Sequence, residues 1–231
     1  IGHNKITHAD PLTTLKALRE LDLNHNPLSS IEPIGQLLNL EILNLSGTGE
    51  HELFVLSRLA KLKKLSVSKK FLNDVNINQL SQLVGLEELD LQRNNLSNLS
   101  SLKHFTSLHT LKVSRNSIKT INGVQTLRKL KKLEARNNTI DDIVQLKFLR
   151  QMKHLELSGN LISNIEPLKG MQNLQLLRLA DNQLTDLKPL QQLTSLKELR
   201  ADGNKITNLS PLKNLFNLRV LDIGENELYD L

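Results

Sequence analysis

The chain has 231 residues, 39% of them hydrophobic, and carries 30 basic against 24 acidic side chains, a formal net charge of +6. It contains no cysteine, which excludes disulfide bonds, thiol chemistry and cysteine-based metal sites and is compatible with a reducing cytosol and with a bacterial or secreted protein alike. No run of 18 apolar residues occurs, so the sequence predicts no membrane span.

Leucine recurs along the chain with a period of 22 residues. Repeats begin at residues 18, 40, 62, 86, 108, 130, 152, 174, 196 and 218, and only the repeat 62–85 is longer, with 24 residues. This period predicts a single repeat domain over residues 1–231, with nine complete repeats at 18–217 and partial repeats at 1–17 and 218–231. Both partial repeats stop in mid-repeat without a polar cap, so we expect the domain to be a segment of a longer chain.

Each repeat predicts the same two elements in chain order. In residues 196–217, LKELRADGNKITNLSPLKNLFN, apolar residues occupy repeat positions one, four and six and then recur every third residue from position eleven. The first spacing is typical of a short strand and the second of a 3₁₀ turn. A bundle of amphipathic helices would require a spacing near 3.6 residues and would not place asparagine at one fixed position.

Asparagine is found at repeat position nine almost throughout, at Asn4, Asn26, Asn94, Asn116, Asn138, Asn160, Asn182, Asn204 and Asn226. Its amide donates and accepts hydrogen bonds, so a buried asparagine can satisfy the backbone where a strand bends into a turn.

Only Thr48 and Lys70 interrupt this asparagine ladder. Because a buried charge without a partner is costly, we expect the turn at Lys70 to open and expose the ammonium group to water. We further expect the extra residues within 71–80, together with the irregular stretch 45–54, to form a bulge that shapes a binding site.

The combined pattern, L-x-x-L-x-L-x-x-N-x-L, is identified as that of leucine-rich repeats. Five of the six prolines lie at repeat position sixteen, and NKITNLSPLKNLFNLRVLDI (204–223) resembles the 22-residue repeats of bacterial internalins and of the nuclear regulatory subunit of protein phosphatase one. The resemblance implies an α/β-type solenoid, a horseshoe with a concave parallel sheet of about ten strands and 3₁₀ or loop segments on the convex side. Such a scaffold does not by itself identify the partner.

The sequence holds no catalytic or metal-binding motif. It lacks GxxxxGK[ST] and HExxH, no Ser/His/Asp grouping falls in register, and its seven histidines are scattered. We therefore predict no enzymatic activity, no metal site and no cofactor within this segment. Function should instead reside on the concave face, which repeat positions two, three, five, seven and eight are expected to line.

Basic residues concentrate at these positions in the four repeats that start at residues 62 to 130, with nine basic against four acidic side chains, a net charge of +5. The two preceding repeats carry −2 and the four following repeats −1 at the same positions. We predict that this patch binds an acidic protein partner, although an ordinary solvated surface would account for the same charges. The candidate binding residues are Lys64, Lys69, Arg93, Lys112, Arg115, Lys132 and Arg136, with Leu176 as an apolar anchor beside Arg178 and Arg200.

Two classes of function remain open. One is protein recognition, by a bacterial effector or surface protein or by an intracellular scaffold; the other is a targeting domain for a ligase or kinase whose catalytic part lies outside this segment. No aromatic residue occupies a concave position, which argues against single-stranded nucleic acid as the ligand. The resembled groups hold partners with concave aromatic side chains, so neither group's ligand is transferred to this chain. The sequence determines neither the oligomeric state nor the compartment.

Overall fold

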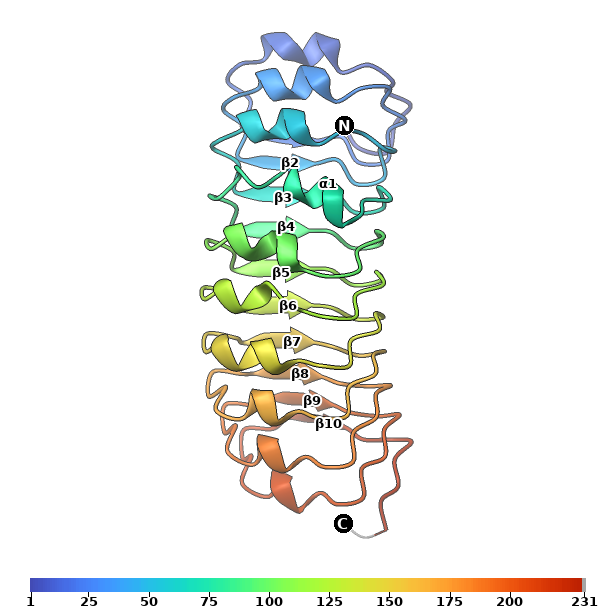
Figure 1. Ribbon diagram of the computed structural model, residues 1–231, viewed down its shortest axis with the longest axis vertical. Coiled ribbons are helices and arrows are strands. Elements are labelled where there is room, and N and C mark those ends of the chain that lie inside the picture. Colours follow the sequence, from blue (N-terminus) through green and yellow to red (C-terminus); the bar gives the residue numbers. More distant parts are fainter. Residues whose placement is uncertain (230–231) are drawn as a thin grey trace.

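The computed structural model describes residues 1–229 as a stack of repeats along one long axis (Figure 1). Each repeat contributes one three-residue strand, and the strands pair in parallel in chain order. The strands are Glu20–Asp22 (β1), Ile42–Asn44 (β2), Lys64–Ser66 (β3), Glu88–Asp90 (β4), Thr110–Lys112 (β5), Lys132–Glu134 (β6), His154–Glu156 (β7), Leu176–Arg178 (β8), Glu198–Arg200 (β9) and Val220–Asp222 (β10).

The convex side of the solenoid, which faces the viewer in Figure 1, is built from short helices. Five of them have a proline in their first turn, where its fixed φ suits the helix and its missing N–H is not needed. The helices are Asp10–Thr14 (η1), Glu32–Gln36 (η2), Phe54–Arg58 (η3), Asp74–Asn78 (α1), Ser100–His104 (η4), Val124–Thr126 (η5), Val144–Phe148 (η6), Glu166–Leu168 (η7), Lys188–Leu190 (η8) and Ser210–Leu212 (η9); all but α1 are 3₁₀ helices.

Leucine at repeat position four forms the centre of the core. Leu43, Leu65 and Leu89 lie in register on neighbouring strands, and each is 1% exposed. Burying one such side chain contributes roughly 1.5–3 kcal/mol to stability. Each repeat thus packs its leucines on those of the next, between the sheet and the helices. The predicted leucine-rich-repeat horseshoe, with ten parallel strands in the described residues, is confirmed.

The asparagine ladder bonds each repeat to the one before it. Asn160 is 5% exposed, and its Nδ2 donates to the carbonyl oxygens of Leu157 (2.7 Å) and of Ala135 in the preceding repeat (3.1 Å). Its Oδ1 accepts from the backbone N–H of Ile140 at 3.0 Å. The predicted role of asparagine is therefore confirmed, since one side chain satisfies three backbone groups.

Lys70 corrects one expectation, because its ammonium group does not turn to water. The side chain is fully buried, and Nζ donates to Thr48 Oγ1 at 2.8 Å and to the Gly49 carbonyl oxygen at 2.5 Å. The long side chain reaches into the preceding repeat, where these two oxygens replace water as its partners. Burial lowers the pKa of Lys70 to about 8.

The segment 71–80, which contains the two extra residues of its repeat, does not form the expected bulge beside the binding surface. It forms α1 on the convex side, where the helix packs against η4 (Figure 1). Asn73 caps this helix, and Asp74 Oδ1 accepts the backbone N–H of Ser97 in the next repeat at 3.0 Å. The pairing of β3 with β4 continues without interruption. The expected contribution of 71–80 to a concave binding site was wrong, because the two added residues complete a helical turn rather than a bulge in the sheet.

No helix within residues 1–229 combines the length and the apolar character that crossing a bilayer requires.

Candidate functional site

The exposed side chains of the strands form the concave surface. Residues at repeat positions three and five alternate with the buried leucine at position four, so they leave the sheet on the same face. Parallel pairing arranges them in rows along the long axis, with Lys64 beside Glu88 and Asp90 beside Lys112. Neighbouring strands are about 4.8 Å apart, so side chains of adjacent repeats come within contact distance.

A further row of side chains follows the carboxyl ends of the strands, at repeat position eight. The backbone there is left-handed in successive repeats, with φ of 54° at Lys69, 54° at Arg93 and 60° at Arg115. The N–H of Lys69 donates to the Gln92 carbonyl (3.0 Å), and that of Arg115 donates to the Arg136 carbonyl (2.8 Å). These bonds fix exposed cations at regular steps along this edge of the sheet.

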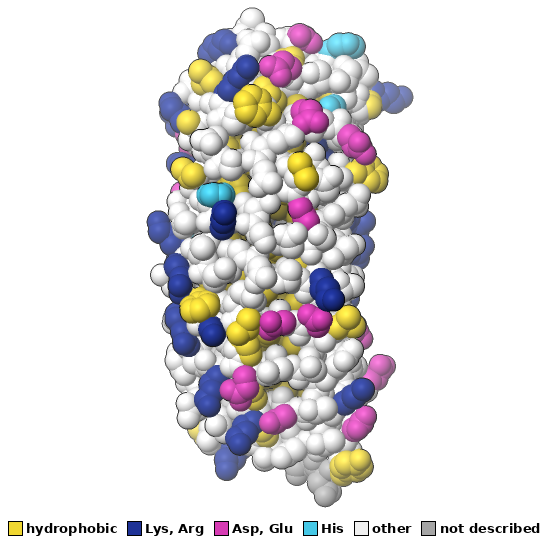
Figure 2. All heavy atoms as spheres, viewed as in Figure 1, with side chains coloured by type: hydrophobic (Ala, Val, Ile, Leu, Met, Phe, Trp, Pro, Cys, Tyr) yellow, Lys and Arg dark blue, Asp and Glu magenta, His cyan; other side chains and the backbone are white. Residues whose placement is uncertain are grey.

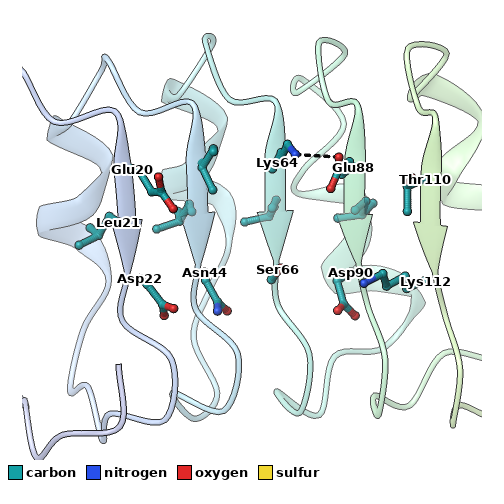
Figure 3. Close-up of a pocket in the computed structure, with 14 residues that line it drawn as sticks. Glu20, Leu21, Asp22, Asn44, Lys64, Ser66, Glu88, Asp90, Thr110 and Lys112 are labelled. Atoms are coloured by element: carbon teal, nitrogen blue, oxygen red, sulfur yellow. Dashed lines mark ion pairs between the residues drawn. The ribbon is translucent and has the colours of Figure 1, made fainter. Parts of the chain in front are cut away.

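Lys64 and Lys112 lie in a depression of about 210 Å³ over β1 to β5 (Figure 3). Lys64 Nζ is 2.8 Å from Glu88 Oε1, and this hydrogen bond raises the pKa of Lys64. Glu20, Asp22 and Asp90 also line the depression, which therefore holds more acidic than basic groups. The amino-terminal part of the predicted patch is not a basic surface.

A second depression, of about 520 Å³, lies over β4 to β8 and is called here the basic depression. It brings together six of the ten predicted binding residues: Arg93, Arg115, Lys132, Arg136, Leu176 and Arg178. Gln92, Ser114, Leu133, Glu134, His154 and Glu156 complete its lining. Five basic and two acidic side chains meet here, so positive charge on the concave surface is concentrated at this place.

Lys69 and Arg200 line neither depression. Lys69 Nζ lies 3.3 Å from His25 Nε2, toward the amino-terminal end of the solenoid. Arg200 Nε donates to Glu198 Oε1 at 2.8 Å. The ten predicted residues therefore share one face but do not form one site.

Ion pairs neutralise some of these cations. Lys132 Nζ lies 2.7 Å from Glu134 Oε1, and Arg178 Nε lies 2.9 Å from Glu198 Oε1. The hydrogen bond from Arg178, assisted by that from Arg200, lowers the pKa of Glu198. Within residues 1–229, no ion pair is formed by Lys69, Arg93, Lys112, Arg115 or Arg136.

His154 belongs to the basic depression but is not among the predicted binding residues. It lies beside Leu176 in the sheet register. Partial desolvation, followed by the positive charges of Lys132, Lys153 and Arg178, lowers its pKa. The neutral imidazole that results can donate and accept hydrogen bonds. A count of formal charges gives no weight to such a group, although its repeat position three places it on the concave face.

The chemistry that this arrangement supports is binding. Guanidinium groups hold carboxylates and phosphates through paired hydrogen bonds. In the part of the chain that the structure describes, no cluster of three or more His, Asp or Glu side chains is arranged around a metal position. The convex face differs from the basic depression, since side chains of both charges are interspersed over it and hydrophobic ones are scattered (Figure 2).

Comparison with known families agrees with the repeat architecture. A family profile described as "Leucine Rich repeats (2 copies)" matches residues 16–50 and 172–214, and one described as "Leucine Rich Repeat" matches residues 85–105. No curated protein sequence matches the chain.

Solved structures match over most of the chain. An internalin (inlF) from Listeria monocytogenes is similar with 33% identity and a TM-score of 0.94, over 100% of this chain and 68% of that one. Internalin C2 of the same organism has 28% identity and a TM-score of 0.78, over 82% and 83% of the two chains. The plant peptide hormone receptor RGFR1, solved with RGF2, has 26% identity and a TM-score of 0.75, over 94% of this chain and 38% of the receptor. The chain belongs to the leucine-rich-repeat proteins, in the branch of the bacterial internalins.

Proposed function

We propose that this chain is a non-enzymatic recognition module that binds a protein partner on its concave face, with the basic depression contacting an acidic part of that partner. The observation that carries the proposal is the excess of five basic over two acidic side chains around the basic depression, which has a volume of about 520 Å³. Arg93, Arg115 and Arg136 in this depression have no ion-pair partner among residues 1–229. They are available to a ligand without first breaking a bond inside the protein.

Similarity to binding proteins supports the same kind of ligand. The receptor RGFR1 was solved in complex with RGF2 and is described as a peptide hormone receptor. A peptide or protein is thus the ligand class that we assign to this chain. The similarity to internalins supports a bacterial effector or surface protein over an intracellular scaffold.

The charge of the basic depression acts mainly on the rate of association. A cleft lined by one sign of charge attracts an oppositely charged partner over a distance and can raise the association rate by 10-fold or more. Added salt screens this attraction over about 8 Å at physiological ionic strength. Binding that depends on the depression should therefore weaken as the salt concentration rises.

Affinity capture with a charge-reversed variant tests this proposal. The native chain and the concave variant Arg93→Glu/Arg115→Glu/Arg136→Glu are immobilised and exposed to host and bacterial lysates, and retained proteins are identified by mass spectrometry. A matched control, Lys103→Glu/Lys147→Glu/Lys188→Glu, makes the same charge change on helices η4, η6 and η8 of the convex side. We expect an acidic protein that the native chain and the control retain and that the concave variant loses. Equal retention by all three proteins would contradict the proposal.

A further inference from the structure

Four cations of the concave surface that make no ion pair lie in four consecutive repeats. Lys69, Arg93 and Arg115 occupy position eight of three consecutive repeats, and Arg136 occupies position seven of the next; these four residues are called the edge row. All four are exposed, and none makes an ion pair within the described residues. Nearer the middle of the sheet, Lys64 is compensated by Glu88 and Lys132 by Glu134, whereas Lys112 makes no ion pair within the described residues.

We propose that the edge row binds an extended acidic peptide segment that runs along the axis of the solenoid. This inference rests on the proposed function and narrows it to one part of the concave surface and one shape of ligand. The middle of the sheet then contributes contact area but less free charge, because Lys64, Lys132 and Arg178 form ion pairs with carboxylates of the same sheet.

Three of the four edge-row residues, Lys69, Arg93 and Arg115, have a left-handed backbone. Position eight is left-handed in every repeat, and in the repeats outside the edge row it holds Gly47, Asn137, Gly159, Asp181 and Gly203 but also His3, His25 and Glu225. Glycine, asparagine and aspartate adopt this conformation at low cost, whereas other residues lose about 1 kcal/mol or more. Six described residues at position eight bear this cost, and Lys69, Arg93 and Arg115 are the three lysine or arginine residues among them.

The backbone also fixes the spacing of the edge row. The N–H of Lys69 donates to Gln92, that of Arg93 donates to Ser114 (2.9 Å), and that of Arg115 donates to Arg136. Arg136 is itself fixed, since its N–H donates to Ser114 Oγ at 3.1 Å. Three strand steps span roughly 15 Å, the length of about five residues of an extended chain.

The chemistry of the row favours a peptide over a nucleic acid. Carboxylates and guanidinium groups match in geometry and charge. Single-stranded nucleic acids are held by stacking of the bases on aromatic side chains, and no aromatic side chain other than the imidazole of His154 lines the basic depression. An acidic peptide needs only the cations and the donors that are present.

A peptide-binding experiment with two charge-matched variants tests the edge row. The edge variant is Arg93→Gln/Arg115→Gln/Arg136→Gln, and the middle variant is Lys64→Gln/Lys132→Gln/Arg178→Gln, so each loses three positive charges from the same face. Binding of fluorescein-labelled hexaglutamate is measured by fluorescence anisotropy at about 0.15 M salt, where charges beyond about 8 Å are screened. Hexaglutamine, hexauridylate and a sulfated hexasaccharide serve as comparison probes, and circular dichroism verifies that both variants are folded.

We expect hexaglutamate to bind the native chain and to lose at least about ten-fold in affinity in the edge variant, against less than about three-fold in the middle variant. Equal losses in the two variants would show that net charge alone attracts the peptide, and the proposal that the edge row binds it would be wrong. Absence of hexaglutamate binding, or tighter edge-dependent binding of hexauridylate or the sulfated sugar, would overturn the acidic peptide as ligand.

The inference and the proposed function can fail separately. Suppose that the concave variant of the capture experiment fails to retain a protein, and that the edge and middle variants lose it equally. The proposed function would then stand, but the edge row would not be its binding site. If the concave variant retained every protein that the native chain captures, the proposed function itself would be wrong.

Discussion

Lys70 Nζ donates a hydrogen bond of 2.8 Å to Thr48 Oγ1, so the two residues that interrupt the asparagine ladder are bonded to each other. Thr48 Oγ1 donates in turn to the Leu45 carbonyl oxygen at 2.8 Å. Beyond the gap the ladder resumes, because Asn94 Oδ1 accepts from the backbone N–H groups of Lys70 (3.0 Å) and Leu72 (3.1 Å). The two departures from asparagine therefore form one compensated feature rather than two independent defects.

Thr48 and Lys70 should be energetically coupled. Thr48→Val removes the hydroxyl group and leaves the buried ammonium short of one acceptor, which should cost about 2 kcal/mol in the free energy of unfolding. In a Lys70→Met background the same change should cost about 1 kcal/mol less, because no ammonium remains to be satisfied. Urea unfolding of the two single variants and the double variant measures this coupling. Additive effects within about 0.5 kcal/mol would mean that the bond does not stabilise the fold.

Lys70 should also make stability depend on pH. Its pKa is about 8 in the folded chain against the ordinary lysine value of 10.5, so the unfolded chain binds more protons between these values. The charged lysine thus lowers stability below pH 8, and stability rises with pH between about 8 and 10.5. The stability advantage of Lys70→Met over the native chain should shrink by about 2 kcal/mol from pH 7 to pH 10. Unfolding in urea at both pH values gives the difference, and a constant advantage would contradict the prediction.

The asparagine ladder should stabilise most where it is buried. Asn160→Ala strands three buried backbone groups and should cost about 3 kcal/mol. Asn226 makes the same set of bonds but is only half-buried, so water can replace its amide, and Asn226→Ala should cost about 1 kcal/mol. Chemical denaturation of the two variants compares these costs. Similar losses at both sites would show that burial does not control the contribution.

Gly123 should tolerate no side chain. Its φ is 108°, and a Cβ atom there would lie 2.2 Å from the Leu99 carbonyl oxygen, which is backbone and cannot move aside. Gly123→Ala should therefore cost about 3 kcal/mol or more. Gly170, with φ of 89°, provides the control, because its added Cβ would meet only the flexible end of Arg150. Gly170→Ala should cost about 1–2 kcal/mol. If thermal unfolding showed a larger loss of stability for Gly170→Ala than for Gly123→Ala, the predicted clash with the Leu99 carbonyl oxygen would be wrong.

Much of the fold could be predicted from the sequence because the fold is nearly one-dimensional. Each repeat contacts mainly its neighbours, so the spacing of leucine along the chain fixes which leucines meet in the core. Leu43, Leu65 and Leu89 fall in register for this reason. Asparagine at position nine, whose amide bonds were inferred from its chemistry, follows the same rule. The same spacing places the candidate binding residues on one face.

What the repeat pattern could not supply depends on the reach of single side chains. Lys70 finds its partners in the preceding repeat, and α1 lies on the convex side because two added residues complete a helical turn there. Lys132 and Arg136 belong to one repeat and were equivalent in the charge count, yet only Lys132 is neutralised, by Glu134. The period alone determined the register and the face, because both follow from backbone pairing. Only the tertiary structure decided which charges remain free, because ion pairs depend on side-chain length and direction between strands.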